Sequence, residues 1–375
     1  MLSNASIDVA FHDKSNLFSD FYNPVIIFSI FKYISIIQII NIIFYYYNNY
    51  FSNDSVLNKI NSKINLFYNL IQNKYYNSTD NKGFQTITED NKSLISQIIP
   101  SDYNLRKKVL KRDLTKYEID YISKFFIGLM DSEGSIQVNH WRYTSIEYRL
   151  VIKLKNLEDN KYMLLLIAKA LNAGIVRVEK NKKNVLWVMN DKTKIVNLCT
   201  TLFKKYPLIT KRKQYQLAFL LLVHKYNDIT FYLENRKDKF NNSLYFNNMH
   251  KLPEKNTISM EEIQKIFFTI NKQNLPNYFN QWLSGFTEGN GCFCIRNNSV
   301  YMSFSLSQND GYELLNIISN YFGSDIKPRL AKNTYIIDIY RKTVLSNIIN
   351  HFNKYNLLGN KNTDFLKWTE YYNNK

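Results

Sequence analysis

Two segments of the sequence carry side chains at spacings that could hold a metal ion. Residues 126–134 read FIGLMDSEG and residues 283–291 read LSGFTEGNG, and the two align position for position. The last residue before the final glycine is Glu133 in the first segment and Asn290 in the second. The helix dipole disfavours a carboxylate at a helix C-terminus, and a divalent cation is the natural group to offset that cost. The first segment therefore indicates a divalent-cation site at Glu133.

The central glycines of the segments, Gly128 and Gly285, predict how the two are arranged. A glycine inside a helix costs about 1 kcal/mol relative to alanine. That cost is accepted where two helices must approach closely. We therefore expect helices over residues 116–131 and 277–288 to pack against each other, which would bring Glu133 and Asn290 together at the foot of the interface.

The other polar and glycine positions of the segments suggest helix endings. Gly134 and Gly291 suit the left-handed turn with which many helices end. Asp131 and Glu288 are interpreted as residues that hydrogen-bond at the helix ends rather than as metal ligands.

Each segment opens the same order of elements. In the run 146–155, Glu147, Arg149 and Lys153 share one parity, whereas the apolar residues share the other. This alternation predicts a half-buried antiparallel strand with a charged outer face. An α-β-β-α-β-β-α unit is predicted over residues 115–226 and again over 276–375, joined by a linker at 227–275. The repeat indicates an α+β protein with pseudo-twofold symmetry in one chain.

The composition narrows the classes of partner. The chain has 375 residues, and 49 Lys and Arg against 31 Asp and Glu give a net charge of +18. This charge favours a polyanionic partner, but abundant Lys, Asn, Ile, Phe and Tyr also indicate an AT-rich coding sequence, and both explanations stay open. The three cysteines are too few for a disulfide framework or a four-thiolate zinc site.

Residues 14–114 differ from the repeat and are interpreted as an N-terminal extension and linker. Residues 24–51 are rich in Ile, Phe and Tyr and long enough to span a bilayer, but they contain central Lys and Asn residues. A membrane association and a poorly selected AT-rich extension both remain open for this stretch. At the start of the chain, Asp8, Asp13 and Asp20 argue against an Arg-rich, acid-free presequence.

The segments at 126–134 and 283–291 resemble the two motifs of LAGLIDADG homing endonucleases and the related group I intron maturases. The resemblance covers residues 115–375, including the order of elements after each motif. It implies two pseudo-symmetric αββαββα domains whose antiparallel sheets bind DNA, preceded by an irregular N-terminal extension. It also implies that Glu133 and the residue at the position of Asn290 bind Mg²⁺. The basic residues beside the scissile phosphates would be Lys211 or Lys213, and Lys361.

The resemblance predicts a monomeric, Mg²⁺-dependent, site-specific DNA endonuclease that acts on double-stranded DNA at an intron insertion site and promotes intron homing. The groove-facing parity of the strands supplies candidate phosphate and base contacts. These candidates are Gln137, Asn139, Arg149, Lys153, Lys155 and Arg177 in the first half, and Arg296, Ser303, Ser305, Lys327 and Arg329 in the second.

One departure from the family pattern keeps other functions open. Asn290 is neutral where the family has an acid, and an amide oxygen ligates a hard cation more weakly than a carboxylate. The alternative is an RNA maturase that assists splicing of its host group I intron, with cleavage weakened or lost. A degenerate reading frame without activity is a third possibility.

The first residues carry a second, short resemblance. Residues 2–13 are similar to an internal stretch of cytochrome c oxidase subunit 1, and the likeness stops at Lys14. Residues 1–13 would then be an exon-encoded segment that continues into an intron reading frame. This implies a protein that is encoded and made in mitochondria, on the matrix side.

Overall fold

The computed structural model of the chain describes residues 95–237, 240, 256, 258–295 and 301–374. The exon-like segment, the apolar run at 24–51 and Arg296 lie outside these residues. Within the described residues, no helix is both long enough and apolar enough to cross a membrane. The cysteines Cys199, Cys292 and Cys294 are free thiols.

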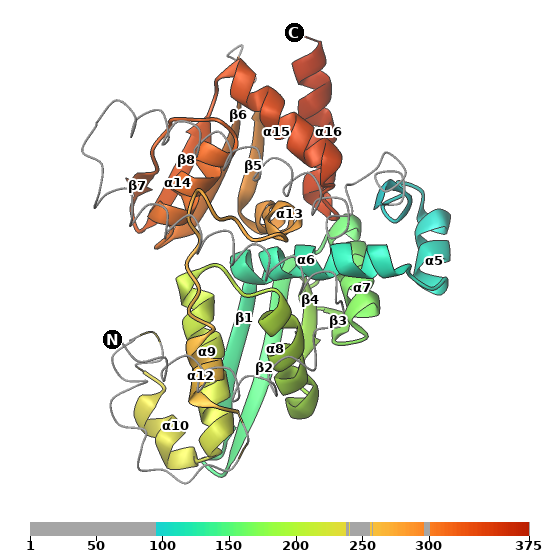
Figure 1. The fold of residues 1–375 in the computed structure, drawn as a ribbon. Helices are drawn as coiled ribbons and strands as arrows, with labels where there is room; N and C mark the ends of the chain where they lie inside the picture. Colours follow the sequence, from blue (N-terminus) through green and yellow to red (C-terminus); the bar gives the residue numbers. More distant parts are fainter. Residues whose placement is uncertain (1–94, 238–239, 241–255, 257, 296–300, 375) are drawn as a thin grey trace, which may run out of the picture. The chain divides into compact units, whose positions relative to one another are not determined.

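The first half of the repeat forms one antiparallel sheet with helices packed around it (Figure 1). The strand order of this sheet is β1-β2-β4-β3. Its elements are α6 (Lys116–Ser132), β1 (Gly134–Trp141), β2 (Ser145–Lys155), α7 (Glu158–Leu171), β3 (Ile175–Val178), β4 (Asn184–Met189), α8 (Lys192–Lys205) and α9 (Lys211–Tyr226).

The second half repeats this topology with the strand order β5-β6-β8-β7. Two short helices, α10 (Ile229–Asn235) and α12 (Met260–Gln264), lie between the halves in the sequence. The same order of elements in both halves confirms the predicted α+β fold with two pseudo-symmetric units. The elements are α13 (Phe279–Asn290), β5 (Gly291–Ile295), β6 (Met302–Asn309), α14 (Tyr312–Tyr321), β7 (Arg329–Ala331), β8 (Thr334–Ile339), α15 (Lys342–Lys354) and α16 (Asn360–Asn373).

Strand β2 shows why the sheet has two different faces. Tyr148, Leu150 and Ile152 are buried, whereas Glu147 and Lys153 on the opposite parity are exposed. Burial of alternate apolar residues fixes the register, because a shift by one residue would turn the charged side chains into the core. The outer face of the first sheet therefore carries the charged side chains of β2, as the alternation predicts.

Helices α6 and α13 pack against each other through their central glycines (Figure 1). A Cβ atom at Gly128 would lie 1.9 Å from the carbonyl oxygen of Trp282, and one at Gly285 would lie 1.9 Å from that of Phe125. No side chain larger than hydrogen fits at either position while the backbones stay where they are. The close helix pair is confirmed.

The glycines that follow these helices have a different role from the predicted one. Gly291 adopts an extended conformation with φ −86° and ψ 154°, and Gly134 is likewise outside the left-handed region. The expectation of left-handed turns is therefore wrong. A Cβ atom at Gly134 would lie 2.5 Å from the Met130 carbonyl oxygen, and one at Gly291 2.6 Å from that of Thr287. Glycine is needed because the strand starts directly against the last helical turn.

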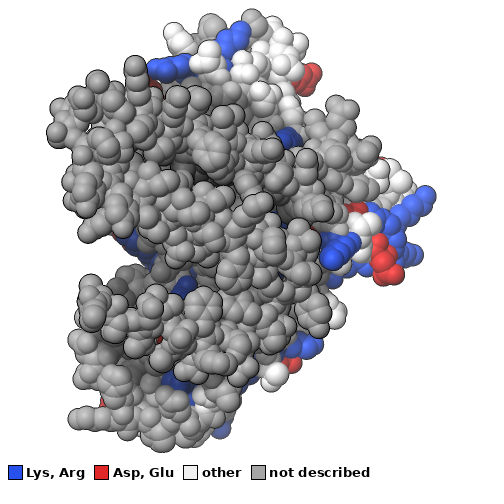
Figure 2. Space-filling model, viewed as in Figure 1, with Lys and Arg blue, Asp and Glu red and all other residues white. Residues whose placement is uncertain are grey.

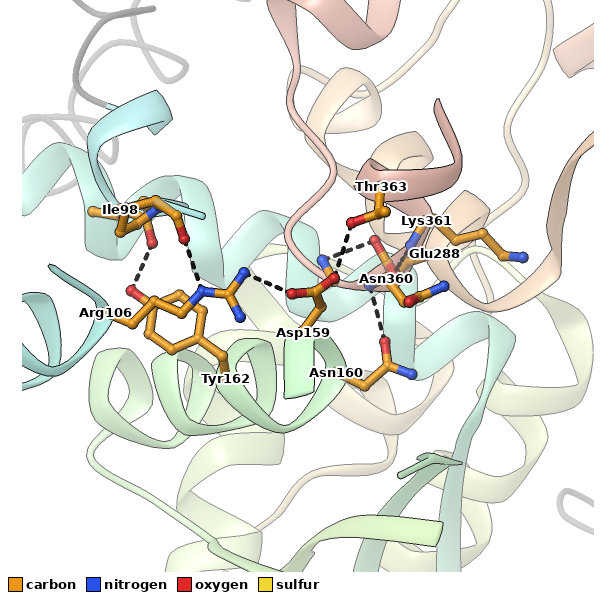
Figure 3. Close-up of polar contacts among 11 residues, drawn as sticks. Ile98, Arg106, Asp159, Asn160, Tyr162, Glu288, Asn360, Lys361 and Thr363 are labelled. Atoms are coloured by element: carbon orange, nitrogen blue, oxygen red, sulfur yellow. Dashed lines mark hydrogen bonds and ion pairs between the residues drawn. The ribbon is translucent and has the colours of Figure 1, made fainter. Parts of the chain in front are cut away.

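Residues 95–112, which include helix α5 (Tyr103–Lys111), pack on helix α7. The Tyr162 hydroxyl donates a hydrogen bond of 2.8 Å to the carbonyl oxygen of Ile98 (Figure 3), and the Ile98 side chain is completely buried. The exposed side chains of Lys107, Lys108 and Lys111 lie on α5. Figure 2 shows basic side chains gathered at the edge of the molecule where α5 lies.

A polar network joins this N-terminal segment to the second half of the repeat through α7 (Figure 3). Arg106 forms an ion pair of 2.6 Å with Oδ1 of Asp159, whose other oxygen accepts a hydrogen bond of 2.9 Å from the Thr363 hydroxyl. The backbone N–H of Asn360 donates to the Asn160 side chain at 3.0 Å. The start of α16 is thus anchored to the first half.

Replacing Asp159 by alanine is expected to lower the free energy of unfolding by about 2 kcal/mol, because hydrogen bonds to a charged group contribute about 1.5–3 kcal/mol. The change removes the acceptor of both Arg106 and Thr363. The neighbouring exposed Glu158 serves as control, since its substitution by alanine removes only a charge near a helix N-terminus. Urea unfolding of both variants tests this, and equal losses would contradict it.

Candidate active site

Glu133 lies at the C-terminal end of α6, where the two central helices meet. It is the C-cap residue, with φ −109° and ψ −7°. A Cβ atom placed on Gly289 would lie 2.6 Å from Cγ of Glu133. The Glu133 side chain therefore contacts the residue that directly precedes Asn290 at the end of α13.

The carboxyl of Glu133 has an electrostatic environment suited to a cation. Its side chain reaches solvent, but the surrounding helix ends remove part of its hydration, and this desolvation raises its pKa. The nearby ammonium of Lys213 acts in the opposite direction and lowers the pKa. A further positive charge at this position would stabilise the ionised carboxylate.

Asn290 presents an amide oxygen at the adjoining helix end. Its Nδ2 donates a hydrogen bond of 2.6 Å to Oε1 of Gln308 on β6, and this bond does not use the amide oxygen. Nowhere in the described residues do three His, Cys, Asp or Glu side chains gather as a ready-made metal site. One carboxylate and one amide oxygen fit a hard cation such as Mg²⁺ when phosphate and water oxygens complete its coordination.

Asp131 and Glu288 hold the loops that precede the last helices of each half. The fully buried Asp131 accepts hydrogen bonds from the backbone N–H groups of Ile209 at 2.8 Å and Thr210 at 3.0 Å. Glu288 accepts from the backbone N–H groups of Gly359 at 3.1 Å and Lys361 at 2.9 Å (Figure 3). Their interpretation as hydrogen-bonding residues is confirmed, and both acids are committed to backbone groups.

Burial raises the pKa of Glu288 to about 7, although the two backbone hydrogen bonds act in the opposite direction and lower it. The folded carboxyl keeps its proton up to about pH 7, whereas the unfolded one releases it near 4.5. Its stabilising contribution is therefore present below pH 4.5 and is lost as the pH rises through 7. Relative to Glu288→Gln, the wild-type chain should lose about 2 kcal/mol of unfolding free energy between pH 5 and 7.

Urea unfolding at several pH values measures this difference. Glu118→Gln is the matched control, because Glu118 is also buried but the ion pair with Arg112 helps to lower its pKa. The difference between this control and the wild type should stay flat between pH 5 and 7. A flat difference for Glu288→Gln as well would contradict the prediction.

The three predicted basic residues occupy different environments. Lys213 is buried and its ammonium donates to the carbonyl oxygen of Gly134 at the start of β1. Desolvation lowers its pKa, whereas Asp131 and Glu133 raise it. Lys211 is exposed and pairs with Glu313 at 3.2 Å, and Lys361 pairs with Asp364 at 3.6 Å. Of the three, the structure brings Lys213 to Glu133.

The predicted contacts of the first half lie on one sheet. The face that carries them also holds a small apolar cluster of Val151, Leu186 and Val188. Strand register places Leu186 between Lys153 and Arg177. The predicted residues are Gln137 and Asn139 on β1, Arg149, Lys153 and Lys155 on β2, and Arg177 on β3.

The apolar cluster is absent from the predicted contacts, although its signal is in the sequence. Val151 shares the parity of Arg149 and Lys153 and thus breaks the charged alternation of β2. Apolar side chains on a groove-facing surface can contact the methyl group of thymine. The cluster adds a candidate base contact to the basic ones.

Among the residues that the structure describes, the second sheet carries less positive charge on the corresponding face. Arg329 on β7 pairs with Asp338 on β8 at 2.7 Å, and the Ser305 hydroxyl on β6 donates to the same carboxylate at 2.6 Å. Ser303 on β6 is only 3% exposed. Lys327 lies before β7, outside the strands, because β7 begins at Arg329. Asp338 thus offsets the charge of Arg329 on this face.

The comparisons with known proteins agree with this geometry. The family model described as LAGLIDADG endonuclease matches residues 126–223 and 283–372. The crystal structure of the meganuclease I-SmaMI bound to uncleaveable DNA shares the fold, with a TM-score of 0.50 and 18% sequence identity, over 66% of this chain and 87% of that one.

Two relatives are named probable intron-encoded endonuclease aI3. The protein of Dictyostelium citrinum is 36% identical over 268 residues, which cover 70% of this chain and 100% of the relative. That of Debaryomyces hansenii is 39% identical over 262 residues, which cover 66% of this chain but only 38% of the longer relative. The family model matches both halves of the repeat, and the Dictyostelium citrinum relative is matched over its whole length. This chain therefore belongs to the LAGLIDADG endonuclease family.

Proposed function

We propose that the chain is a site-specific endonuclease that hydrolyses double-stranded DNA at an intron insertion site and so promotes intron homing. The observation that carries this proposal is the placement of Glu133 against Gly289, the residue before Asn290, with the Lys213 ammonium bound to Gly134 at the start of β1. The names of the relatives and their intron origin support it. One chain contains both halves, which supports action as a monomer.

In phosphodiester hydrolysis, Lys213 and the two sheets would have different roles. Water attacks phosphorus, a new P–O bond forms, one ester P–O bond breaks, and the leaving oxygen takes a proton. Lys213 places a positive charge beside the reacting phosphate. The outer faces of the two sheets hold the duplex through phosphate contacts from their basic side chains and through contacts to base edges.

Glu133 and the amide oxygen of Asn290 would hold the divalent cation. Endonucleases of this family generally depend on divalent metal ions. Such a cation stabilises the charge that develops on phosphate and lowers the pKa of bound water. Oxygen ligands suit a hard cation such as Mg²⁺.

A maturase that assists splicing of the host group I intron is the second candidate. The observation that favours it is Asn290, because loss of a charged ligand is tolerated when cleavage is no longer required. RNA would then occupy the basic faces, and neither Glu133 nor Lys213 would be needed.

The names of other relatives support a mitochondrial protein. The matches include an uncharacterized cox1 intron-2 protein of Schizosaccharomyces pombe and an uncharacterized mitochondrial protein of Saccharomyces cerevisiae, each 24% identical. We place the chain in the mitochondrial matrix, where intron-containing DNA and its transcripts are found.

The test uses purified protein and labelled duplex DNA that spans the ligated exons of the host gene. Cleavage with Mg²⁺ and none with EDTA is the expected result. Absence of cleavage together with Mg²⁺-independent acceleration of intron splicing would favour the maturase instead.

A further inference from the structure

Besides Asn290, the candidate site of the second half differs from that of the first at one more position. The N-caps of α9 and α16 are Thr210 and Gly359, and each follows two buried aliphatic residues. In the first half, Asp131 accepts hydrogen bonds from the backbone N–H groups of Thr210 and Ile209. In the second half, Glu288 accepts hydrogen bonds from those of Gly359 and Lys361. Aligned on these caps, the third helical residue is Lys213 in the first half and Asn362 in the second.

This alignment separates Lys361 from the position of Lys213. Lys361 is the second residue of α16 and corresponds to Arg212, and its ammonium lies 3.6 Å from Asp364 on the same helix. The amide of Asn362 therefore stands where the first half has a buried ammonium. At the matching positions the second half therefore has neither the acid nor a lysine. The Lys361 ammonium, one residue earlier in the chain, acts instead on Glu288 and Cys292.

Lys213 shows why the two replacements belong together. Its ammonium is buried against the Gly134 carbonyl group, and the charges of Asp131 and Glu133 offset part of the desolvation that lowers its pKa. A buried cation is stable when anions compensate its lost hydration. In the second half, Asn290 removes one of these two charges. A lysine at 362 would then be undercompensated, and an amide avoids this cost.

We propose that Asn290 and Asn362 form a matched neutral pair that leaves the second half-site unable to cut, so that the chain nicks one strand of its target. The inference deepens the endonuclease function proposed above and rests on it. Which strand is cut is then decided by one pair of residues in each half, at positions 133 and 213 in the first and at 290 and 362 in the second. Both sheets still bind the duplex, because none of these four residues lies on a strand.

The first test moves the charged pair into the second half. On end-labelled target DNA, the wild type should cut one strand. Asn290→Asp/Asn362→Lys should raise cutting of the other strand by about 100-fold, the order expected for a group that stabilises transition-state charge. Each single replacement should raise cutting of that strand by less than about one tenth of this gain. Asn290→Asp alone supplies the metal ligand without the positive charge, and Asn362→Lys alone supplies the positive charge without the ligand.

A second readout needs no cleavage. In thermal unfolding without metal, Asn362→Lys should lower the melting temperature by about 5 °C. Adding Asn290→Asp should restore most of the loss, because it returns the compensating charge. Additive shifts would show that the positions are not coupled and would overturn the pairing.

A mirror variant keeps the proposal falsifiable if the double variant folds poorly. Glu133→Asn/Lys213→Asn gives the first half the neutral pair that the second half already accommodates, and it should fold and lose the remaining nicking. Equal cutting of both strands by the wild type would overturn the inference. If neither the wild type nor the double variant cuts bound target DNA, the endonuclease function itself fails; nicking without gain in the double variant refutes only the paired half-site.

Discussion

Replacing Glu133 by glutamine is expected to reduce DNA cleavage by at least about 100-fold, as loss of a group that stabilises transition-state charge does. The substitution keeps the shape of the side chain and removes its negative charge. Glu133 is the carboxylate at the junction of the two helix ends, and the other site oxygen belongs to a neutral amide. Loss of this charge leaves no anionic ligand for a hard cation.

Binding of the target should change by less than about threefold, because phosphate contacts to basic side chains supply most of the affinity. Gel-shift titration in EDTA at fixed salt measures binding, and end-labelled DNA measures cleavage. Glu370→Gln is the control, since Glu370 is an exposed acid on α16 away from the helix junction. Unchanged cleavage by Glu133→Gln would show that the metal assignment is wrong.

Replacing Gly285 by alanine is expected to lower the free energy of unfolding by more than about 3 kcal/mol, beyond the usual cost of an extra methylene in a packed core. The added Cβ atom would lie 1.9 Å from the carbonyl oxygen of Phe125 and 2.8 Å from its carbonyl carbon. These are backbone atoms inside a helix, so the two helices must separate. Helix propensity alone predicts the opposite sign, since alanine is favoured by about 1 kcal/mol.

Urea or thermal unfolding monitored by circular dichroism tests this result. Gly311→Ala is the comparison, because its nearest contacts, at 2.6 Å, are Cβ and Cγ of Gln308 rather than the backbone of a packed helix. Gly311 is the N-cap of α14, and Gly311→Ala should lower the free energy of unfolding by about 1 kcal/mol, as a changed N-cap residue does. A Gly285→Ala chain as stable as the comparison variant would refute close packing of α6 and α13.

The fold was predictable because its signals are local and occur twice. Alternating charge in β2 marked the outer face of a sheet, and glycine inside two helices marked a close contact. The roles of Asp131 and Glu288 followed from their place at a helix end. The acids accept hydrogen bonds from backbone groups more than 70 residues away in the sequence, and those partners could not be named in advance.

Other features of the candidate site depended on contacts that leave no local pattern. The choice of Lys213 over Lys211 follows from burial of its ammonium against Gly134, 79 residues earlier. The reduced charge of the second sheet depends on Asp338 in the neighbouring strand. Gly134 and Gly291 look like helix-ending glycines in sequence, and only the packing of strand on helix shows that space, not backbone angle, requires them.

By itself, the sequence determined the repeat, the α+β class, the helix pair and the position of the acid and the amide, because side-chain periodicity and glycine placement act over a few residues. The tertiary structure decided which lysine lies at Glu133, and it fixed the caps of α9 and α16 on which Asn362 aligns with that lysine. It also decided that residues 95–112 belong to the folded unit. These outcomes depend on burial and charge compensation between distant segments, which exist only once the chain has folded.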